Sequence, residues 1–149
     1  MNISTEQRQH WIAVLAKAPT EALRTLSDSV VSDMQFEVIR EPEIGLMQVR
    51  ARMGGTGDAF NMGDMTVTRC VVRSHNDTLG FSYIAGRNKP HALRAAQLDA
   101  MLQLSDFHQR LTDTVIEPLK QQLINTRQVK QQAIAATKVD FFTLVRGED

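Results

Sequence analysis

Apolar residues near the start of the chain recur at the spacing of α-helices, in two runs that a proline separates. The apolar positions of the two runs are Trp11, Leu15, Ala18, Leu23, Leu26 and Val30. Ser4 and Gln7 have the spacing of a capping box, which predicts the start of the first helix. Pro19 ends that helix because it has no backbone N–H to donate, and Thr20 is the expected cap of the second helix.

From about residue 35 the spacing of apolar residues changes to two, the period of a half-buried strand. The pattern predicts four strands, near residues 35–40, 46–53, 65–73 and 79–85. Pro42 and Gly45 mark the break between the first two strands, and residues 76–78 are typical of a turn before the fourth. Because no helical segment separates the strands, we expect them to pair antiparallel.

Helical spacing returns after the fourth strand. Asn88 is the expected cap, and Pro90 is tolerated in the first turn. The helical apolar positions that follow are Ala95, Leu98, Leu102, Phe107, Leu111 and Val115. Pro118 is expected to break or restart a helix, and residues 119–138 look helical but carry few large apolar side chains. The whole pattern predicts one α+β domain, residues 1–149, with a four-stranded antiparallel sheet flanked by N-terminal and C-terminal helices.

Composition narrows the class of protein. A chain of 149 residues with 42% apolar residues can bury one ordinary core. Lys plus Arg and Asp plus Glu each number 17, and zero net charge argues against a nucleic-acid or membrane-surface binder. No stretch is long and apolar enough to span a membrane, and no secretory signal is expected. The single cysteine, Cys70, lies in an apolar strand run, so we expect its thiol to be buried. Because one cysteine cannot form an internal disulfide and no secretory signal is expected, we expect a cytoplasmic protein.

A glycine-rich loop between the second and third predicted strands is the first candidate binding site. It follows Arg52 and contains Gly54, Gly55 and Gly57. Glycine backbone N–H groups can approach an anion closely. The loop leads into a strand, however, and matches neither a P-loop nor a dinucleotide fingerprint. A hairpin connection is the preferred interpretation, and an anion site is the alternative.

A basic cluster at the predicted helix start is the second candidate. Arg87, His91 and Arg94 lie where helix N–H groups and the helix dipole favour negative charge. A solvated charged helix start explains them equally well. His91 has the chemistry of a general acid or base, but nothing in the sequence marks it as tuned for that work. The four histidines lie far apart, and no nucleophile motif is present. The sequence therefore contains no self-contained active site and no metal site.

Two further groups of residues leave alternatives open. Arg69 and Arg73 share one strand face, where they can hold a polyphosphate or pair with carboxylates of a partner chain. Near the C-terminus, Phe141 and Phe142 belong to an apolar run that ends at Arg146. Such a run either docks on the chain's own core, which is the default, or is buried against a partner.

Several segments, in order along nearly the whole chain, resemble the PhnG family. They are Arg8-Gln9-His10-Trp11, Phe36-Glu37-Val38-Ile39-Arg40, Arg50-Ala51-Arg52-Met53-Gly54-Gly55-Thr56-Gly57, Leu79-Gly80-Phe81-Ser82-Tyr83, Gly86-Arg87-Asn88-Lys89 and Val139-Asp140-Phe141-Phe142-Thr143-Leu144-Val145-Arg146-Gly147. Each motif is modest by itself, but their combined order is specific.

The resemblance implies a subunit of a carbon–phosphorus lyase core complex with PhnH, PhnI and PhnJ. With PhnH, PhnI and PhnL, such proteins are associated with the attack of a phosphonate on ATP, which releases adenine. No cofactor is expected on this chain, since the iron–sulfur cluster belongs to PhnJ. Expected anion or partner contacts are Arg52, Gly54, Gly55, Gly57, Arg87 and His91, and expected partner contacts are Phe141, Phe142 and Arg146. The alternatives are a free-standing enzyme with His91 as acid or base, and a scaffold that never approaches substrate.

Overall fold

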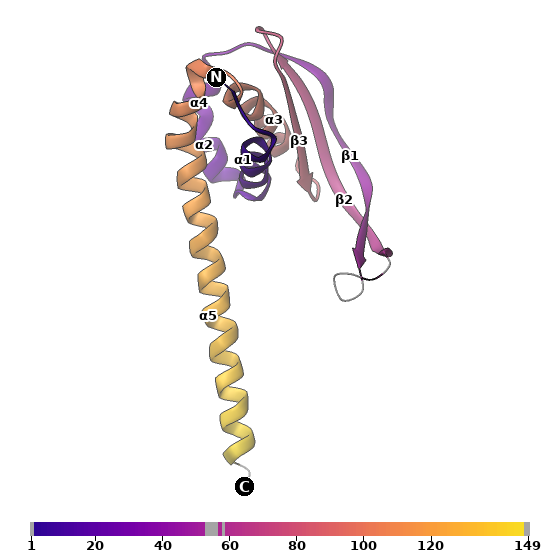
Figure 1. The fold of residues 1–149 in the computed structure, drawn as a ribbon, viewed down its shortest axis with the longest axis vertical. Helices are drawn as coiled ribbons and strands as arrows, with labels where there is room; N and C mark the ends of the chain where they lie inside the picture. Colours follow the sequence, from indigo (N-terminus) through magenta and orange to yellow (C-terminus); the bar gives the residue numbers. More distant parts are fainter. Residues whose placement is uncertain (1, 53–56, 58, 148–149) are drawn as a thin grey trace.

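The computed structural model describes residues 2–52, 57 and 59–147, with the backbone alone at residues 49, 51, 52, 59–62 and 138–147. The elements are α1 (Thr5–Lys17), α2 (Thr20–Val31), β1 (Phe36–Arg52), β2 (Ala59–Ser74), β3 (Leu79–Ala85), α3 (Lys89–Leu102), α4 (Ser105–Leu111), η2 (Thr112–Ile116) and α5 (Glu117–Gly147). Figure 1 shows α1 to α4 gathered beside β3, with the β1–β2 hairpin and α5 extending from this body.

The start of α1 confirms the capping box, whereas the start of α2 differs from the prediction. Ser4 Oγ accepts a hydrogen bond from the Gln7 N–H (3.1 Å), and Gln7 Oε1 accepts one from the Ser4 N–H (3.0 Å). Thr20 does not cap α2: it is the first helical residue, and Pro19 holds the cap position without a side-chain hydrogen bond. The Thr20 hydroxyl instead contacts α3.

Over the described residues the sheet has three antiparallel strands in the order β1–β2–β3, so the expectation of four strands was wrong. The two strands predicted on either side of Pro42 and Gly45 form the single strand β1. β1 lies at the edge of the sheet, where a residue without an N–H is tolerated. Pro42 falls where the register with β2 shifts, between Arg40 and Glu43. The proline therefore marks an irregularity within an edge strand, not a strand end.

The region from the turn before β3 to the start of α3 forms as the sequence predicts. The turn before β3 contains Asp77 with a φ of 62°, and Gly86 ends β3 with a φ of 87°. That positive φ suits glycine, which has no Cβ to clash with the backbone. Asn88 caps α3, because its Oδ1 accepts from the His91 N–H (3.2 Å).

α3 is the central helix of the core and packs on all three strands. Its residues without exposed surface are Ala92, Ala96, Leu98, Asp99, Ala100, Met101 and Leu102. Small side chains on this helix let it approach β3 closely at Gly80. A Cβ atom at Gly80 would lie 2.0 Å from the Ala96 carbonyl oxygen and 2.8 Å from the Ala100 nitrogen. The distance between helix and sheet therefore depends on glycine at this position.

The C-terminal helical residues run without interruption from α4 through η2 into α5. Pro118, which was expected to break or restart a helix, lies in the first turn of α5. Just before it, the Glu117 N–H donates to the Thr112 carbonyl, five residues back, in a π-helical turn. This wider turn comes just before Pro118, which has no backbone N–H to donate to a helical carbonyl. α5 continues to Gly147 and runs well past the other elements (Figure 1).

Candidate functional site

His91 lies in a buried polar cluster between α1, α2 and α3, with only 3% of its surface exposed. Its Nε2 lies 2.8 Å from the Leu15 carbonyl oxygen, and its Nδ1 lies 3.0 Å from Thr20 Oγ1. A carbonyl can only accept, so Nε2 carries the proton. Thr20 Oγ1 accepts from Asn88 Nδ2 (2.8 Å) and donates to Nδ1. A neutral imidazole therefore satisfies every contact in the cluster.

This geometry leaves neither ring nitrogen of His91 available to a substrate, so it supports a structural role and not acid–base chemistry. The other two basic residues of the predicted cluster have separate surroundings. Arg87 is exposed before α3. Arg94 faces α2, where its Nη1 lies 2.8 Å from Asp28 Oδ1 and 2.9 Å from Ser27 Oγ. His91 and Arg94 line one cavity between α2 and α3, whereas Arg87 does not line it, so the structure brings together only two of the three basic side chains.

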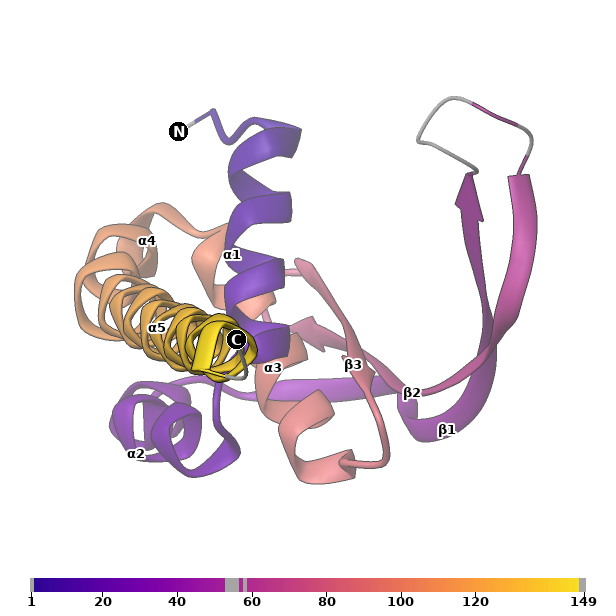
Figure 2. The ribbon, with the colours of Figure 1, turned by 90° about the horizontal axis from the view of Figure 1, so that it is seen from below.

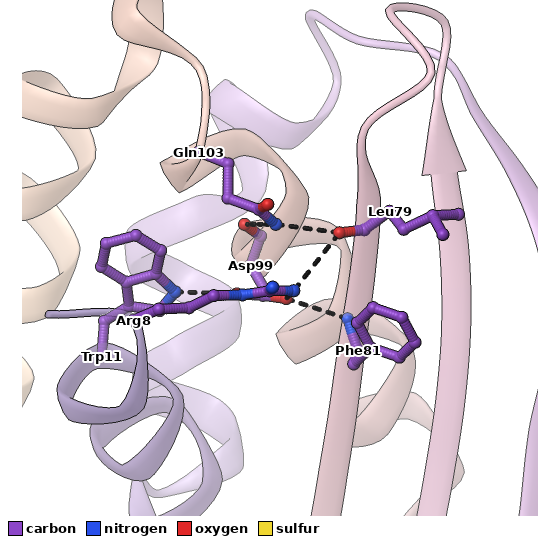
Figure 3. A network of polar contacts seen from close by, with 6 residues as sticks. All are labelled: Arg8, Trp11, Leu79, Phe81, Asp99 and Gln103. Carbon is purple, nitrogen blue, oxygen red and sulfur yellow. Dashed lines mark hydrogen bonds and ion pairs between the residues drawn. The ribbon is translucent and has the colours of Figure 1, made fainter. Parts of the chain in front are cut away.

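A second buried polar cluster is centred on Asp99 of α3 (Figure 3). The Asp99 side chain has no exposed surface. Its Oδ1 accepts from Trp11 Nε1 (2.8 Å) and Arg8 Nε (3.2 Å). Its Oδ2 accepts from Arg8 Nη2 (2.8 Å) and the Phe81 N–H (2.9 Å). The hydrogen bond to Asp99 raises the pKa of Arg8 above its ordinary value. A carboxylate that accepts this many hydrogen bonds is fixed in one geometry.

The Asp99 cluster ties α1 and α3 to the outer edge of β3. The Leu79 carbonyl accepts from Gln103 Nε2 (2.8 Å) and Arg8 Nη2 (3.5 Å). The Arg8 guanidinium also lies 5.5 Å from the centre of the Phe81 ring. In Figure 3 the Leu79 and Phe81 side chains point away from Asp99. An acidic residue inside the apolar stretch 98–102 was the only sequence signal for this cluster, and the prediction did not use it.

Cys70 is the single cysteine and lies on the covered face of β2 with 1% of its surface exposed. Burial raises the pKa of its thiol to about 11, and the negative charge of Glu41 adds to this effect. A buried thiol with a raised pKa is a poor nucleophile. The prediction of a buried strand cysteine is confirmed.

We expect Cys70 to resist alkylation in the folded protein. At pH 8 a thiol with a pKa of about 11 is ionised in roughly one molecule in a thousand, and the strand also shields it from reagent. Iodoacetamide labelling followed by intact-mass measurement should show no adduct in buffer and complete modification in concentrated urea. Rapid labelling in buffer would contradict both the burial and the raised pKa.

The helices cover one face of the sheet and leave the other face open (Figure 2). Along β3, alternate residues are buried under the helices, and the residues between them are exposed. On the open face Leu79 is 41%, Phe81 37% and Tyr83 55% exposed. Within the described part of the chain, every exposed large apolar side chain lies on the three strands or on α5. Such a concentration of exposed apolar surface is typical of a protein-binding site.

Ion pairs between β1 and β2 occupy the rest of this open face. Arg69 Nη2 lies 2.6 Å from Glu43 Oε1, and Arg73 Nη2 lies 2.5 Å from Glu37 Oε2. The two arginines thus pair within the chain, an arrangement that the sequence alone did not indicate. Because these side chains are exposed, each pair adds little to stability. With Arg69 and Arg73 paired, the face is better suited to a protein surface than to a polyphosphate.

The glycine-rich segment connects β1 to β2. The last pair of the ladder is Arg52 with Ala59, which confirms the hairpin interpretation. Gly57 lies in a bend. Gly54 and Gly55 lie outside the described residues, as does the Arg52 side chain. The alternative of an anion site at this loop stays a prediction.

The candidate residues near the C-terminus lie in the last turns of α5. Figure 1 shows these turns extending away from the other helices and strands. The side chains of Phe141, Phe142 and Arg146 lie outside what the structure describes, so their contacts stay a prediction.

Neither a metal site nor a membrane-spanning helix occurs in the described residues. No group of three or more His, Cys, Asp or Glu side chains there is arranged to hold a metal ion. No helix in the same part of the chain is long and apolar enough to cross a bilayer. The features that stand out are therefore two buried polar clusters and the exposed apolar surfaces of the sheet and α5.

Comparisons with known proteins give one consistent result. Residues 6–147 match the model of a family described as phosphonate metabolism protein PhnG. Over 143 residues the chain is 37% identical to a protein of Rhizobium meliloti (strain 1021), the alpha-D-ribose 1-methylphosphonate 5-triphosphate synthase subunit PhnG. That match covers 96% of this chain and 91% of the relative. Both matches extend from α1 into α5, so they include the two buried clusters and the open face of the sheet.

Proposed function

Because this chain belongs to the PhnG family of phosphonate metabolism proteins, we propose that it is a non-autonomous subunit of an alpha-D-ribose 1-methylphosphonate 5-triphosphate synthase. In this reaction a phosphonate oxygen replaces adenine at the ribose of ATP, and the triphosphate is retained. The complex carries out the chemistry, and this chain contributes binding surfaces that assemble it.

The distribution of exposed apolar side chains is the observation that carries the proposal. Leu46 on β1, Tyr83 on β3 and Ile134 on α5 are 72%, 55% and 61% exposed. They lie on a sheet with one uncovered face, on a hairpin and on a helix that both extend from the body (Figures 1 and 2). A free-standing protein rarely exposes so much apolar surface on extended elements, whereas a subunit buries it against partners.

The buried reactive groups support the same proposal, since none is available to a substrate. Both His91 nitrogens have partners within the chain. Asp99 accepts four hydrogen bonds with no exposed surface. The Cys70 thiol is buried and its pKa is raised. A free-standing enzyme needs an acid, a base or a nucleophile that converges on an accessible cavity.

The partners that fit this role are PhnI, PhnH and PhnL for the transfer step, together with PhnJ, which carries the iron–sulfur cluster, in one cytoplasmic assembly. Within it, Arg52 and Arg87 are proposed to lie at an interface or near the triphosphate. The last turns of α5, which contain Phe141 and Phe142, extend away from the body and are proposed to contact a partner.

We expect acidic substitutions on the open face of the sheet to release the partner subunits. Met47 pairs with Met65 in the β1–β2 ladder, Tyr83 pairs with Arg69, and both Met47 and Tyr83 are exposed. Burying two new carboxylates at an interface should weaken it about tenfold or more. Tagged wild type and Met47→Asp/Tyr83→Asp would be purified from host cells grown on methylphosphonate. Companion subunits would be quantified by mass spectrometry, and adenine release from ATP would be assayed.

The matched control adds two carboxylates elsewhere, at exposed positions on α2 and in the β2–β3 turn. Thr25→Asp/His75→Asp should still recover the companion subunits and should retain activity. Recovery of the wild-type chain without companions, or adenine release by the isolated chain, would refute the proposed function. Equal recovery of companions with the open-face variant would move the interface to another surface.

A further inference from the structure

A groove of about 520 Å³ runs between α1 and α5. Its apolar lining includes Val14 of α1 and Leu123 and Ile124 of α5. Ile124 is 38% exposed, although it lies beside the body of the protein. The groove thus has an apolar floor that the described residues leave uncovered.

The rim of the groove is positively charged and unpaired. It carries Lys17, Lys120, Arg127 and Lys130, and no acidic residue from the described part of the chain lines it. None of these four cations forms an ion pair with another described residue, in contrast to the arginines that do: Arg8, Arg69, Arg73, Arg94 and Arg110. In a chain with zero net charge, four unpaired cations around one groove create a local field that attracts a negatively charged partner.

The groove side of α5 continues beyond α1 as a stripe at helical spacing. Residues three or four positions apart share one face of a helix. The residues of this stripe have that spacing: Lys120, Leu123, Arg127, Lys130 and Ile134. Ile134 is 61% exposed, and the later turns of α5 extend past the rest of the body (Figure 1). From Lys120 to Lys130 the charges extend over about 15 Å of helix axis.

We propose that this groove and the stripe that continues it bind an acidic amphipathic helix of a partner subunit. The inference rests on the proposed function, because it identifies the kind of segment that a partner contributes. Carboxylates about one, two and three turns apart on such a helix match the spacing of Lys120, Arg127 and Lys130. Apolar residues between them would cover Leu123, Ile124 and Ile134 in the helix-in-groove mode.

A polyphosphate matches this site less well than a helix does. Three of the four cations are spread along three turns of α5, and only Lys17 lies on α1. The floor between them is apolar, and a phosphate would lose hydration there without gaining a hydrogen bond. A helix satisfies both parts of the site, because it places its own apolar stripe on the floor and its carboxylates at the rim.

The first test is zero-length cross-linking of the purified complex. A carbodiimide joins lysine amines only to carboxylates in direct contact. We expect Lys17, Lys120 and Lys130 to link to Asp or Glu residues of one partner segment, spaced three, four or seven residues apart. Links to scattered carboxylates, or the absence of any link from these lysines to a partner, would overturn the proposal.

The second test reverses two charges at the rim. Arg127→Glu/Lys130→Glu should lower the affinity for the partner that cross-links to Lys120 by about tenfold or more, most strongly at low salt. The control, Arg24→Glu/Lys89→Glu, makes the same change in net charge at exposed helix positions outside the groove and should leave affinity unchanged. Circular dichroism of both variants would establish that each is folded.

The outcomes separate this inference from the function on which it rests. If the wild-type chain recovers no companions, the proposed function fails. If companions bind the wild type and Arg127→Glu/Lys130→Glu equally, only the inference about the groove fails. Protection of Lys120 and Lys130 from acetylation by ATP in the isolated chain would also overturn it, in favour of a nucleotide site.

Discussion

Gly80→Ala is expected to lower the thermal midpoint of unfolding by about 10 °C. The new Cβ would meet the Ala96 carbonyl oxygen at 2.0 Å and the Ala100 nitrogen at 2.8 Å. Both atoms belong to the backbone of α3, so relief requires a shift of the whole helix away from β3. Such overpacking should cost about 3 kcal/mol of unfolding free energy. The measurement is a thermal melt followed by circular dichroism.

Gly45→Ala is the matched control for this substitution. Gly45 lies in edge strand β1, and a Cβ there would have no neighbour within 4 Å. We expect its midpoint to stay within about 2 °C of the wild type, as for most exposed substitutions. If Gly80→Ala behaved like this control, α3 would have to be free to move relative to the sheet, and the central place given to it in the core would be wrong.

Asp99→Asn is expected to lower the free energy of unfolding by about 3 kcal/mol. Asparagine has the same shape, but its amide nitrogen cannot accept a hydrogen bond. Depending on which way the amide points, either Trp11 Nε1 or the Phe81 N–H would lose its hydrogen-bond acceptor. Arg8 would also lose the negative charge with which it pairs. Urea unfolding followed by fluorescence measures this effect, because Trp11 is the single tryptophan and contacts Asp99 directly.

Asp28→Asn provides the comparison, since it also removes a carboxylate from an arginine pair. Asp28 is 57% exposed, and water can replace its contact with Arg94. We expect a loss below about 1 kcal/mol and unchanged Trp11 emission. Equal effects of the two substitutions would show that the Asp99 cluster is hydrated and loosely packed, contrary to its burial.

The elements that could be predicted are those with a local physical cause. The capping box at Ser4, the cap at Asn88 and the end of β3 at Gly86 depend on residues a few positions apart, and each formed as expected. Cys70 was predicted to be buried from the apolar residues beside it, and it is. The family resemblance depended on the order of such local motifs along the chain, and the matches over residues 6–147 agree with it.

Errors arose where the outcome depended on the neighbours that a segment acquires in the fold. A proline normally ends a central strand but is tolerated in an edge strand. Pro42 lies in β1, which is an edge strand of the sheet, so the strand continues through it. Thr20 has the chemistry of a helix cap, yet its hydroxyl joins Asn88 and His91 across the α2–α3 contact. The spacing of residues along the chain predicts neither the edge position of β1 nor the contact of Thr20 with α3.

The sequence by itself determined the α+β class, the element ends at Ser4, Gly86 and Asn88, and the family, because these follow from local periodicity, caps and motif order. Only the tertiary structure decided which charged residues meet. His91 moved from a candidate acid or base to a buried structural contact, and Asp99 became the centre of a cluster through Arg8 and Trp11, about 90 positions away in the chain. The fold also left one sheet face and a basic groove uncovered by the described residues, because exposure depends on what packs against a residue.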